Sequence, residues 1–195
     1  MSRGRPRSFD RDTALHAMMQ VFWARGYEGA QLIDLTAAAG IAPPSFYAAF
    51  GSKEATFLEA VELYIRTVGA GPMDALETAP TFQEGLRAML MASVDVALSQ
   101  RPGGCLLILG VVNCLPENEA ARNGLKEARR VTRGLIEKRL KRARAENELP
   151  KDADIARTSA FIHGAMQMIS FQARDGANRA ELEALVEPVI KAVVL

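Results

Sequence analysis

The side chains that could bind a metal ion or act as nucleophiles are few in this 195-residue chain and far apart in the sequence. The chain has two histidines, His16 and His163, and two cysteines, Cys105 and Cys114. Histidines this far apart do not match the ligand spacing of zinc sites, so we expect no metal ion. The cysteines would lie on opposite sides of a helix, so we expect neither a disulfide nor a shared metal site.

Motifs for covalent or phosphate chemistry are also missing from the sequence. It contains no nucleophile motif, no glycine-rich phosphate loop and no pair of carboxylates in an apolar setting. We therefore predict no enzyme activity and no cofactor. The alternative is an enzyme or carrier for a small apolar molecule, which a turnover assay would reveal. A redox trigger at Cys105 or Cys114 is disfavoured, because apolar surroundings raise the pKa of a thiol and reduce its reactivity.

The composition is that of a folded helical protein without a membrane span. Hydrophobic residues make up 49% of the chain, which is enough for a sizeable core. No run approaches the roughly 18 apolar residues of a membrane span, and no apolar segment follows the N-terminal arginines, so we expect a cytoplasmic protein. The formal net charge is +1, and residues 1–53 hold six basic against four acidic side chains, which permits nucleic-acid binding without indicating it.

The most informative stretch, residues 31–55, predicts two short helices joined by a tight turn. Gly40 stands where the first helix should end, since glycine readily adopts the left-handed conformation of a helix stop. Pro43 suits the first turn of the second helix. This layout is that of a DNA-reading helix-turn-helix, and also that of an ordinary helical hairpin. The side chains expected on the apolar faces are Leu32, Leu35, Ala38, Ala39, Phe46 and Phe50.

The ordered residues around this stretch resemble the DNA-binding domain of the TetR family of transcriptional regulators. The resemblance implies an all-α protein, in which an N-terminal three-helix helix-turn-helix domain packs on a larger C-terminal helical bundle, with about nine helices in all. We predict residues 1–52 for the arm and DNA-binding domain and residues 53–195 for ligand binding and dimerisation. The matching pieces are Gly26-Tyr27, Leu32-x-x-Leu35-x-x-Ala38-Ala39-Gly40-Ile41, Ser45-Phe46-Tyr47-x-x-Phe50 and Ser52-Lys53-Glu54.

By this resemblance the helix over residues 43–50 would read the major groove of a near-palindromic, double-stranded operator. Tyr47 and Lys53 would each contact a phosphate, and Ala48 could meet a thymine methyl group. Ala48 stands where the family often has a bulkier polar residue. The basic arm would follow phosphates or enter the minor groove, the alternative being a merely solvated tail. The predicted DNA-contacting residues are Arg3, Arg5, Arg7, Gln31, Pro43, Pro44, Ser45, Tyr47, Ala48 and Lys53.

Beyond the hairpin, apolar residues at helical spacing predict further helices and no strand. A helix over residues 53–68 should be broken by Gly69–Pro72. The apolar run 105–115 favours a buried helix over an isolated strand, because no second strand is available to pair with it. The long basic segment 117–146 indicates a solvated helix face, with a second nucleic-acid surface as the alternative. The remaining predicted helices follow residue 81, start at Ala153, and begin after an Asn178 cap.

The last two helices carry more apolar surface than one layer could hide, so we predict a homodimer through them. The family resemblance also implies a repressor with a ligand pocket, and an apolar body with few polar groups suits a small hydrophobic effector. A hydrogen-bonded core or a polar spot at the dimer seam would explain the polar candidates equally well. The candidate ligand-binding residues are Met89, Cys105, Leu109, Asn113, Phe161, His163, Met166, Gln167 and Phe171.

Overall fold

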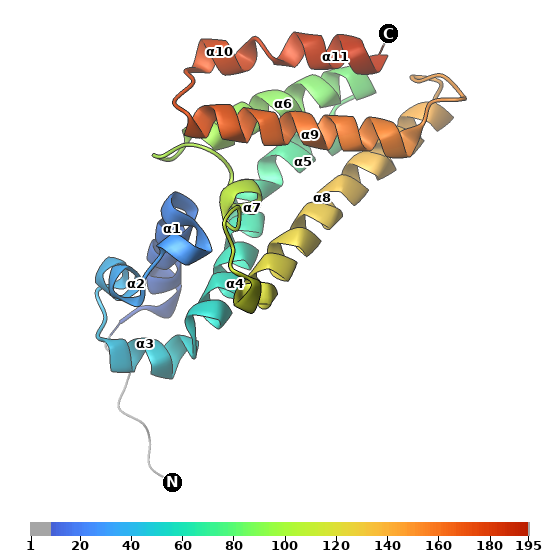
Figure 1. Ribbon diagram of the computed structural model, residues 1–195. Helices are drawn as coiled ribbons and strands as arrows, with labels where there is room; N and C mark the ends of the chain where they lie inside the picture. The colour runs from blue at the N-terminus through green and yellow to red at the C-terminus, as the bar shows by residue number, and fades with distance from the viewer. Residues whose placement is uncertain (1–8, 195) are drawn as a thin grey trace.

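The computed structural model describes residues 9–194, and these form helices and connecting turns with no β-strand. Figure 1 shows a small N-terminal head of three helices at one end of a larger helical body. Across residues 9–194, no helix is both long enough and apolar enough to cross a membrane. The head consists of α1 (Arg11–Gly29), α2 (Leu32–Ala39) and α3 (Pro43–Phe50).

The body begins with a long helical rod that leaves the head. The rod and the helices that follow are α4 (Lys53–Tyr64), the π-helical turn η1 (Ile65–Gly69), α5 (Ala70–Thr78), α6 (Phe82–Leu98), α7 (Leu106–Leu109), the 3-10 turn η2 (Pro116–Asn118), α8 (Glu119–Ala145), α9 (Ile155–Arg174), α10 (Arg179–Glu183) and α11 (Val186–Val194). Counting the rod as one interrupted helix, and α10 with α11 as another, the described chain has the predicted nine helices.

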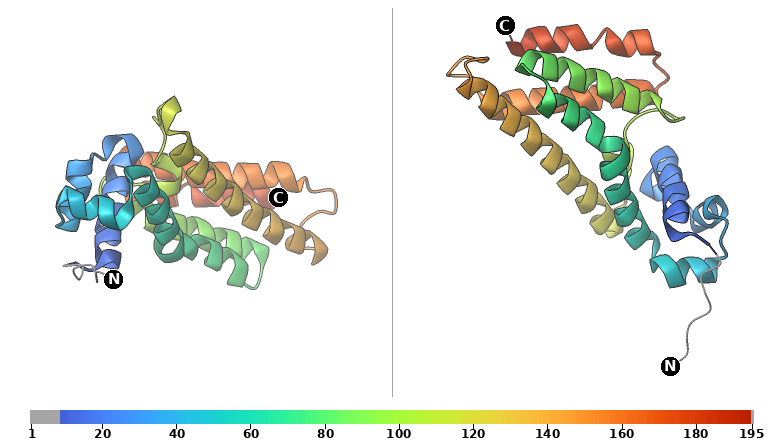
Figure 2. Two further views of the ribbon diagram at one scale, coloured as in Figure 1. Left: turned by 90° about the horizontal axis from the view of Figure 1, so that it is seen from below. Right: turned by 180° about the vertical axis from the view of Figure 1, so that it is seen from behind.

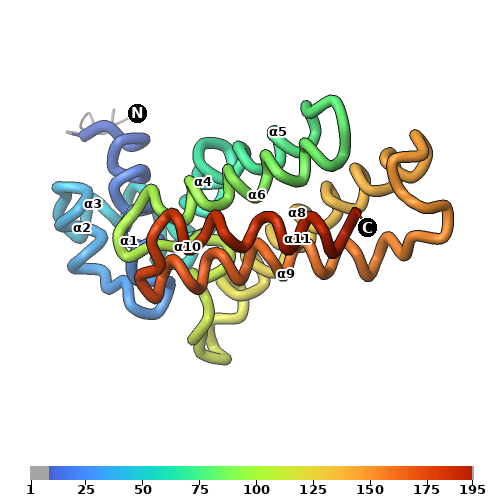
Figure 3. Tube along the Cα trace, turned by 90° about the horizontal axis from the view of Figure 1, so that it is seen from above, coloured from blue at the N-terminus to red at the C-terminus, as the bar shows by residue number. Residues whose placement is uncertain are grey.

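Helix α8 forms one side of the body and contacts α4, α5 and α9, whereas α6 contacts α5, α9, α10 and α11. In the right view of Figure 2, α3 lies at the bottom of the molecule and α11 at the top. Seen from above, α9 and the α10–α11 pair run side by side, with α6 next to them (Figure 3). Helix α9 and the α10–α11 pair therefore form an outer layer of the body, and its α11 end lies far from α3.

The helix-turn-helix forms as its sequence predicts. Gly40 ends α2 with a φ of 64°, and Pro43 occupies the first position of α3. Leu35 and Phe46 are fully buried in the head. Ala38 is exposed, which corrects its predicted place on the apolar face. It lies about 60° around α2 from Leu35, on the side away from the other apolar residues of the helix.

The predicted helix break at Gly69–Pro72 is wrong. The chain continues from α4 through a wide π-helical turn into α5, so that one rod runs from Lys53 to Thr78. Pro72 is the third residue of α5. In the first turn of a helix the backbone N–H has no partner within that helix, so the missing N–H of proline is tolerated there. The proline that indicated a break is therefore accommodated by a local change in helical winding.

The buried helix predicted over residues 105–115 is also wrong beyond Leu109. Helix α7 has only four residues, and Val112 and Leu115 are 55% and 48% exposed. The reason is a tertiary hydrogen bond: the Gly110 carbonyl accepts from the backbone N–H of Tyr27 at 2.7 Å, instead of serving a continued helix. Local apolarity could not reveal this competing partner.

Two smaller boundary corrections concern the last helices. Asp154 caps α9 by accepting a hydrogen bond from the Arg157 N–H at 3.0 Å, so the helix starts two residues later than predicted. The final helix is interrupted before Val186, and Pro188 falls in the first turn of α11, where a proline is tolerated. The predicted Asn178 cap is confirmed by its 3.2 Å bond from the Glu181 N–H.

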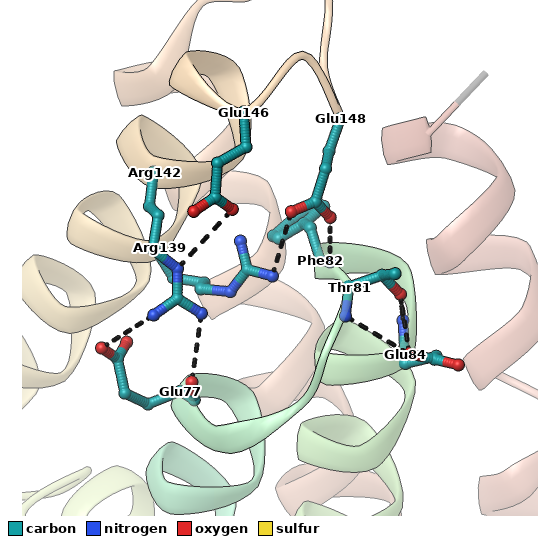
Figure 4. A network of polar contacts seen from close by, with 8 residues as sticks. All are labelled: Glu77, Thr81, Phe82, Glu84, Arg139, Arg142, Glu146 and Glu148. Atoms are coloured by element: carbon teal, nitrogen blue, oxygen red, sulfur yellow. Dashed lines mark hydrogen bonds and ion pairs between the residues drawn. The ribbon is translucent and has the colours of Figure 1, made fainter.

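The basic face of α8 is largely neutralised by neighbouring carboxylates. Arg142 binds the Glu77 carboxylate and carbonyl, each at 3.1 Å (Figure 4). The guanidinium of Arg139 is buried above the Phe82 ring and lies 3.5 Å from Glu148, which also accepts from the Phe82 N–H. These contacts join the end of α8 to α5 and α6. They fit the predicted solvated structural face better than a second nucleic-acid surface.

The buried apolar side chains form two clusters. One fills α6, the end of α8, α9 and the C-terminal helices, with Leu86 and Ile162 fully buried. The other fills the head and continues into α4, α7 and the start of α8, where Leu106 and Leu125 are fully buried. The apolar core of the head thus extends past residue 52, and the boundary between residues 52 and 53 stays a prediction.

Candidate nucleic-acid interface and effector cavity

The outward face of α3 carries the small and polar residues that the sequence predicts for DNA reading. Pro43, Pro44 and Ala48 are exposed, and Ser45 is partly buried. Tyr47 is 55% exposed, and its ring packs edge-on against the buried Phe46 with the centroids 5.4 Å apart. The phenol is thus held at the surface by an aromatic neighbour, where the prediction of a phosphate contact requires it to be.

Two further predicted contact residues lie at helix N-termini and are held by local bonds. The side-chain amide of Gln31 donates to the Glu28 carbonyl at 3.0 Å, while its backbone N–H donates to Asp34 at 3.0 Å. The ammonium of Lys53 lies 4.4 Å from the centroid of the Tyr27 ring. Burial lowers the pKa of Lys53, and the negative charge of Glu28 partly opposes this effect. Both side chains reach the surface as constrained groups.

Arg11 is a structural residue of this face that the sequence analysis missed. Its guanidinium binds Glu59 of α4 at 2.7 Å, donates to the Ala49 carbonyl at 3.2 Å and lies 4.5 Å from the Phe50 ring centroid. It therefore fixes the end of α3 against α1 and α4. No sequence signal could have shown this role, because the partners lie about 40 to 50 residues away in the chain.

The described part of the head has no excess of positive charge. Between residues 9 and 53 there are three basic side chains, of which Arg11 pairs with Glu59 and Arg25 pairs with Asp34. Four acidic side chains lie in the same range. The predicted contact residues Arg3, Arg5 and Arg7 lie outside the described residues. Any net attraction of the head for phosphates must therefore come from that arm and from backbone N–H groups.

The head is joined to the body through the segment that contains α7. The indole Nε1 of Trp23 donates to the Gly104 carbonyl at 2.7 Å, and the Tyr27 N–H donates to Gly110. A Cβ at Gly26 would lie 3.1 Å from the Gly110 carbonyl oxygen, and Gly26 has a φ of 69°. The chain needs glycine there both for its conformation and for this close approach.

Two more contacts complete this joint. The Glu28 carboxylate accepts from the Leu115 N–H at 2.9 Å and from the Asn118 side chain at 2.7 Å. From α9, the Arg174 guanidinium donates to the carbonyls of Trp23 and Ala24 at 3.1 and 2.8 Å. Arg174 thereby satisfies carbonyl groups near the end of the regular part of α1. The end of α1 is thus held by both the α7 segment and the outer layer.

A small cavity lies in the body next to this joint. Its volume is about 40 Å³, and most of its wall is apolar. A groove of about 500 Å³ between the α4–α5 rod and α8 shares Gly69, Met73, Leu107 and Thr132 with it. The cavity is lined by Tyr64, Gly69, Pro72, Met73, Ser93, Val96, Cys105, Leu107, Ile108, Arg129, Thr132, His163, Met166 and Ser170.

The polar groups of the cavity are uncharged except for one arginine. The Tyr64 hydroxyl donates to the Cys105 sulfur at 3.2 Å, and burial raises the pKa of both groups. Burial also lowers the pKa of His163, and the positive charges of Arg129 and Arg133 lower it further, so its imidazole is neutral at pH 7. Arg129 donates to the Leu107 carbonyl at 2.6 Å and stays charged, although burial lowers its pKa.

The sequence matches known family models across both parts of the chain. Residues 14–60 match the model described as bacterial regulatory proteins, tetR family. Residues 83–187, more than half of the chain, match the model of a tetracyclin repressor-like C-terminal domain. The chain belongs to the TetR family. The resemblance carried by the helix-turn-helix residues is thereby confirmed.

Related proteins of this TetR-family chain are transcriptional regulators over nearly its whole length. The HTH-type transcriptional repressor ComR of Escherichia coli strain K12 is 31% identical over 183 residues, which are 93% of this chain and 87% of ComR. The regulator YezE of Bacillus subtilis strain 168 is 29% identical over 187 residues, which are 94% of this chain and 96% of YezE. The family and these relatives are transcriptional regulators and not enzymes, which supports the prediction that this chain is a regulator.

A solved structure with DNA matches this chain closely. It shows a cysteine mutant of the TetR family transcriptional regulator CifR with 26-base-pair double-strand operator DNA. Its TM-score to this structure is 0.92 at 42% identity, covering 96% of this chain and 99% of that chain. This TetR-family protein is a DNA-binding transcriptional regulator with an N-terminal helix-turn-helix and a larger helical body.

The predicted ligand residues of this TetR-family protein separate into two groups. Cys105, His163 and Met166 line the cavity, and the other six do not. Phe161 and Phe171 lie on the outer face of α9, because only one side of that helix faces the body. The others outside the cavity are Met89 in the apolar core, the partly buried Leu109 and Gln167, and Asn113, exposed in the turn after α7.

Several cavity residues were not predicted, and their distance in sequence explains why. Tyr64 falls in the helix predicted over residues 53–68, where nothing in the sequence marks it as a cavity residue. Ser93 and Thr132 each lie within a helix without a distinctive motif. Arg129 could not be distinguished by sequence from the other basic residues of α8. Within residues 9–194, no group of three or more histidine, cysteine or acidic side chains is placed to hold a metal ion.

The outer face of α9 presents an apolar stripe. Phe161, Met168 and Phe171 are 48%, 37% and 44% exposed, and their spacing places them on one side of the helix. Gly164 lies between them, and a Cβ added there would meet no atom within 4 Å. A stripe of large apolar side chains around a glycine is the pattern expected where two helices meet closely.

Proposed function

We propose that this TetR-family regulator is a dimeric repressor that binds a near-palindromic operator in the cytoplasm and leaves it when a small, largely apolar effector enters the body. The observation that carries this proposal is the dual role of the segment 104–118. Its side chains at Cys105, Leu107 and Ile108 line the cavity, while its backbone at Gly104 and Gly110 holds α1.

DNA reading is assigned to α3 and its surroundings. Tyr47 would donate to a phosphate, and Ser45 would contact a base edge or a phosphate. The exposed Pro43, Pro44 and Ala48 offer apolar contact to thymine methyl groups. Lys53 and Gln31 would meet phosphates at the N-termini of α4 and α2. With so few polar side chains on α3, the arm arginines Arg3, Arg5 and Arg7 would share the affinity, and DNA shape would share the specificity.

Dimerisation is assigned to the apolar stripe on α9 together with the adjoining α10–α11 layer. A twofold axis through this face would cover Phe161, Met168 and Phe171 with the same residues of a second copy. The two heads would then reach successive major grooves on one side of the operator, about 34–36 Å apart.

Effector action follows from a shift in population between two body conformations. A ligand between the α4–α5 rod and α8 pushes on Leu107 and Ile108, and thereby on the two backbone carbonyls that hold α1. A changed head orientation misplaces one α3 relative to the other, which weakens binding to the operator. The coupling is limited to the difference in ligand affinity between the two conformations.

The experiment that tests this function is binding to DNA from upstream of the chain's own gene, followed by anisotropy across a salt series. We expect a saturable complex of one dimer per site, with binding weaker by about 0.9 log unit per log unit of salt for each phosphate contact. Tyr47→Ala should weaken binding at least about tenfold, whereas the exposed Lys126→Gln on α8 should not. If a selection from random oligonucleotides also yields no preferred site, the proposal is wrong.

A further inference from the structure

The cavity described above holds one feature that an entirely apolar effector leaves unused. Arg129 of α8 is partly buried in its wall and, within residues 9–194, has no carboxylate oxygen within 4.0 Å. Its hydrogen bond goes from Nη1 to the Leu107 carbonyl, while Nε and Nη2 bond to no described residue. A partly desolvated guanidinium without a counter-charge is costly, because charge in such a place needs a partner.

Most of the other arginines of α8 have a carboxylate partner. Arg144 is a second exception, since it donates to the Ala153 carbonyl at 3.4 Å, but it does not line the cavity. Arg130 binds Glu127 at 2.6 Å, and Arg133 lies 3.4 Å from Glu137. Arg142 binds Glu77 at 3.1 Å. These side chains have acidic partners at the surface, whereas Arg129 turns toward the cavity, where no aspartate or glutamate is among the lining residues.

One further polar group of the cavity can donate to an anion. The neutral imidazole of His163 carries one N–H that can donate a hydrogen bond. The Ser93 hydroxyl already donates its proton to the Met89 carbonyl at 2.8 Å, so we assign it no role in holding the anion. The positive charge of Arg129 is felt at His163, whose pKa it helps to lower. Arg129 is thus the one charged side chain among the described residues that line the cavity.

The size of the cavity fits a head group, and the groove fits a chain. The 40 Å³ inner space is about three times the volume that a single water needs, which is comparable to a carboxylate. The adjoining groove of about 500 Å³ has the size of a small-molecule site and is walled by Leu58, Ile65 and Leu135. Glu62, Asp74 and Glu127 also line it, and these three carboxylates disfavour a second negative charge at the outer end of a ligand.

We propose that the effector is a monocarboxylic acid with an apolar chain, whose carboxylate pairs with Arg129 in the cavity and whose chain lies in the groove between the α4–α5 rod and α8. This proposal rests on the effector role of the cavity proposed above. A carboxylate can accept two parallel hydrogen bonds from the free edge of the guanidinium, which is the geometry that arginine favours.

The test compares three probes with the same eight-carbon chain: octanoate, 1-octanol and octylammonium. Isothermal titration calorimetry measures their binding to the full-length protein, and Trp23 fluorescence gives a second signal. The Trp23 ring packs edge-on against Tyr64, with the centroids 4.9 Å apart, and Tyr64 lines the cavity. We expect octanoate to bind at least about tenfold more tightly than octanol, and octylammonium to bind more weakly than either.

Variants separate the role of the charge from that of the fold. Arg129→Gln should weaken octanoate at least about tenfold and leave octanol unchanged. Arg129→Lys keeps the charge and should retain the preference for octanoate, although more weakly because the bidentate geometry is lost. Lys126→Gln removes one positive charge from the exposed face of the same helix and should change neither affinity. Circular dichroism melts confirm that each variant is folded.

The outcomes distinguish this inference from the proposed function. Equal affinity for octanoate and octanol, an unchanged octanoate affinity in a folded Arg129→Gln protein, or no octanoate binding at millimolar concentration would overturn the carboxylate site. Operator binding is measured on the ligand-free protein in the same series, so loss of the site leaves the DNA-binding result standing. Octanoate binding that depends on Arg129 but does not release operator DNA supports the site and overturns its effector role.

Discussion

The indole nitrogen of Trp23 donates a 2.7 Å hydrogen bond to the carbonyl oxygen of Gly104, and this bond links the DNA-reading head directly to the wall of the cavity. The next residue along the chain, Cys105, lines that cavity. The bond therefore connects α1 to the chain one residue before a side chain of the proposed effector site.

Removing this bond should weaken the connection between the two parts. In Trp23→Phe the buried Gly104 carbonyl loses its donor, which should lower the free energy of unfolding by about 1–3 kcal/mol. Urea melts measure this change. We also expect the effector to release operator DNA less completely, because one of the bonds that transmit the shift is gone. An unaltered effector response in this variant would show that the other contacts of the joint suffice.

The arm should supply most of the electrostatic attraction to DNA. Replacing Arg3, Arg5 and Arg7 with glutamine should reduce the slope of log affinity against log salt by about 0.9 for each arginine that contacts a phosphate. The reason is that residues 9–53 hold four acidic but only three basic side chains. Anisotropy across a salt series checks the slope, with Lys126→Gln as a control that removes one positive charge outside the head. A slope that is the same with and without the arginines would assign the phosphate contacts to the helices alone.

The stripe on α9 should hold two copies together. Phe161→Arg places a charge in the centre of the proposed seam and should give a monomer at micromolar concentration, measured by light scattering. Operator affinity should fall at least about tenfold with it, because a single head loses the second half-site. Val112→Arg changes an equally exposed apolar residue after α7 and should leave the dimer intact. A Phe161→Arg protein that still sediments as a dimer would move the seam elsewhere.

Acid should destabilise the protein partly through His163. Its pKa lies below the ordinary value of about 6.5 in the folded state, because burial and then the charges of Arg129 and Arg133 disfavour the imidazolium. Between that lowered value and 6.5 the unfolded chain binds the proton more readily, so the free energy of unfolding falls as the pH is lowered through this window. Thermal melts at pH 7.5 and 5.5 should show a smaller pH effect in His163→Gln. The exposed His16→Gln serves as the matched control, and a wild-type-like pH effect in His163→Gln would assign the acid sensitivity to other groups.

The two cysteines should not act as a peroxide switch. Burial raises the pKa of both Cys105 and Cys114, so each is present as the less reactive thiol. Operator affinity measured before and after mild hydrogen peroxide should be the same. A loss of affinity that disappears in Cys105→Ser or Cys114→Ser would instead identify the sensing thiol.

Local chemistry explains which features could be predicted from the sequence. Gly40 and Pro43 define the turn through their own backbone preferences, and Phe46 with Phe50 defines the buried face of α3 through spacing alone. Such signals need no knowledge of distant partners. The helix-turn-helix was therefore predictable apart from the exposure of Ala38, and the assignment of α3 to DNA reading stays a prediction.

The features that escaped prediction depend on partners from elsewhere in the chain. Helix α7 stops early because Tyr27, more than 80 residues away, uses the carbonyl of Gly110. Pro72 indicated a break, but a π-helical turn before it carries the helix on. The role proposed for Arg129 depends on the folded arrangement, in which most other arginines of α8 pair with carboxylates and Arg129 lines the cavity. The cavity was predictable as a property of the body, but most of its lining was not.

The position of Arg174 has a consequence for the spacing of operator half-sites. Arg174 lies on α9, the same helix whose outer face carries Phe161 and Phe171, and it holds the carbonyls of Trp23 and Ala24 in α1. In the proposed dimer one helix thus sets both the seam and the anchoring of each head. Sliding the seam by one helical turn, about 5.4 Å, would displace each head by a comparable distance. The number of base pairs between the half-sites therefore depends on the position at which two copies of α9 cross in the dimer.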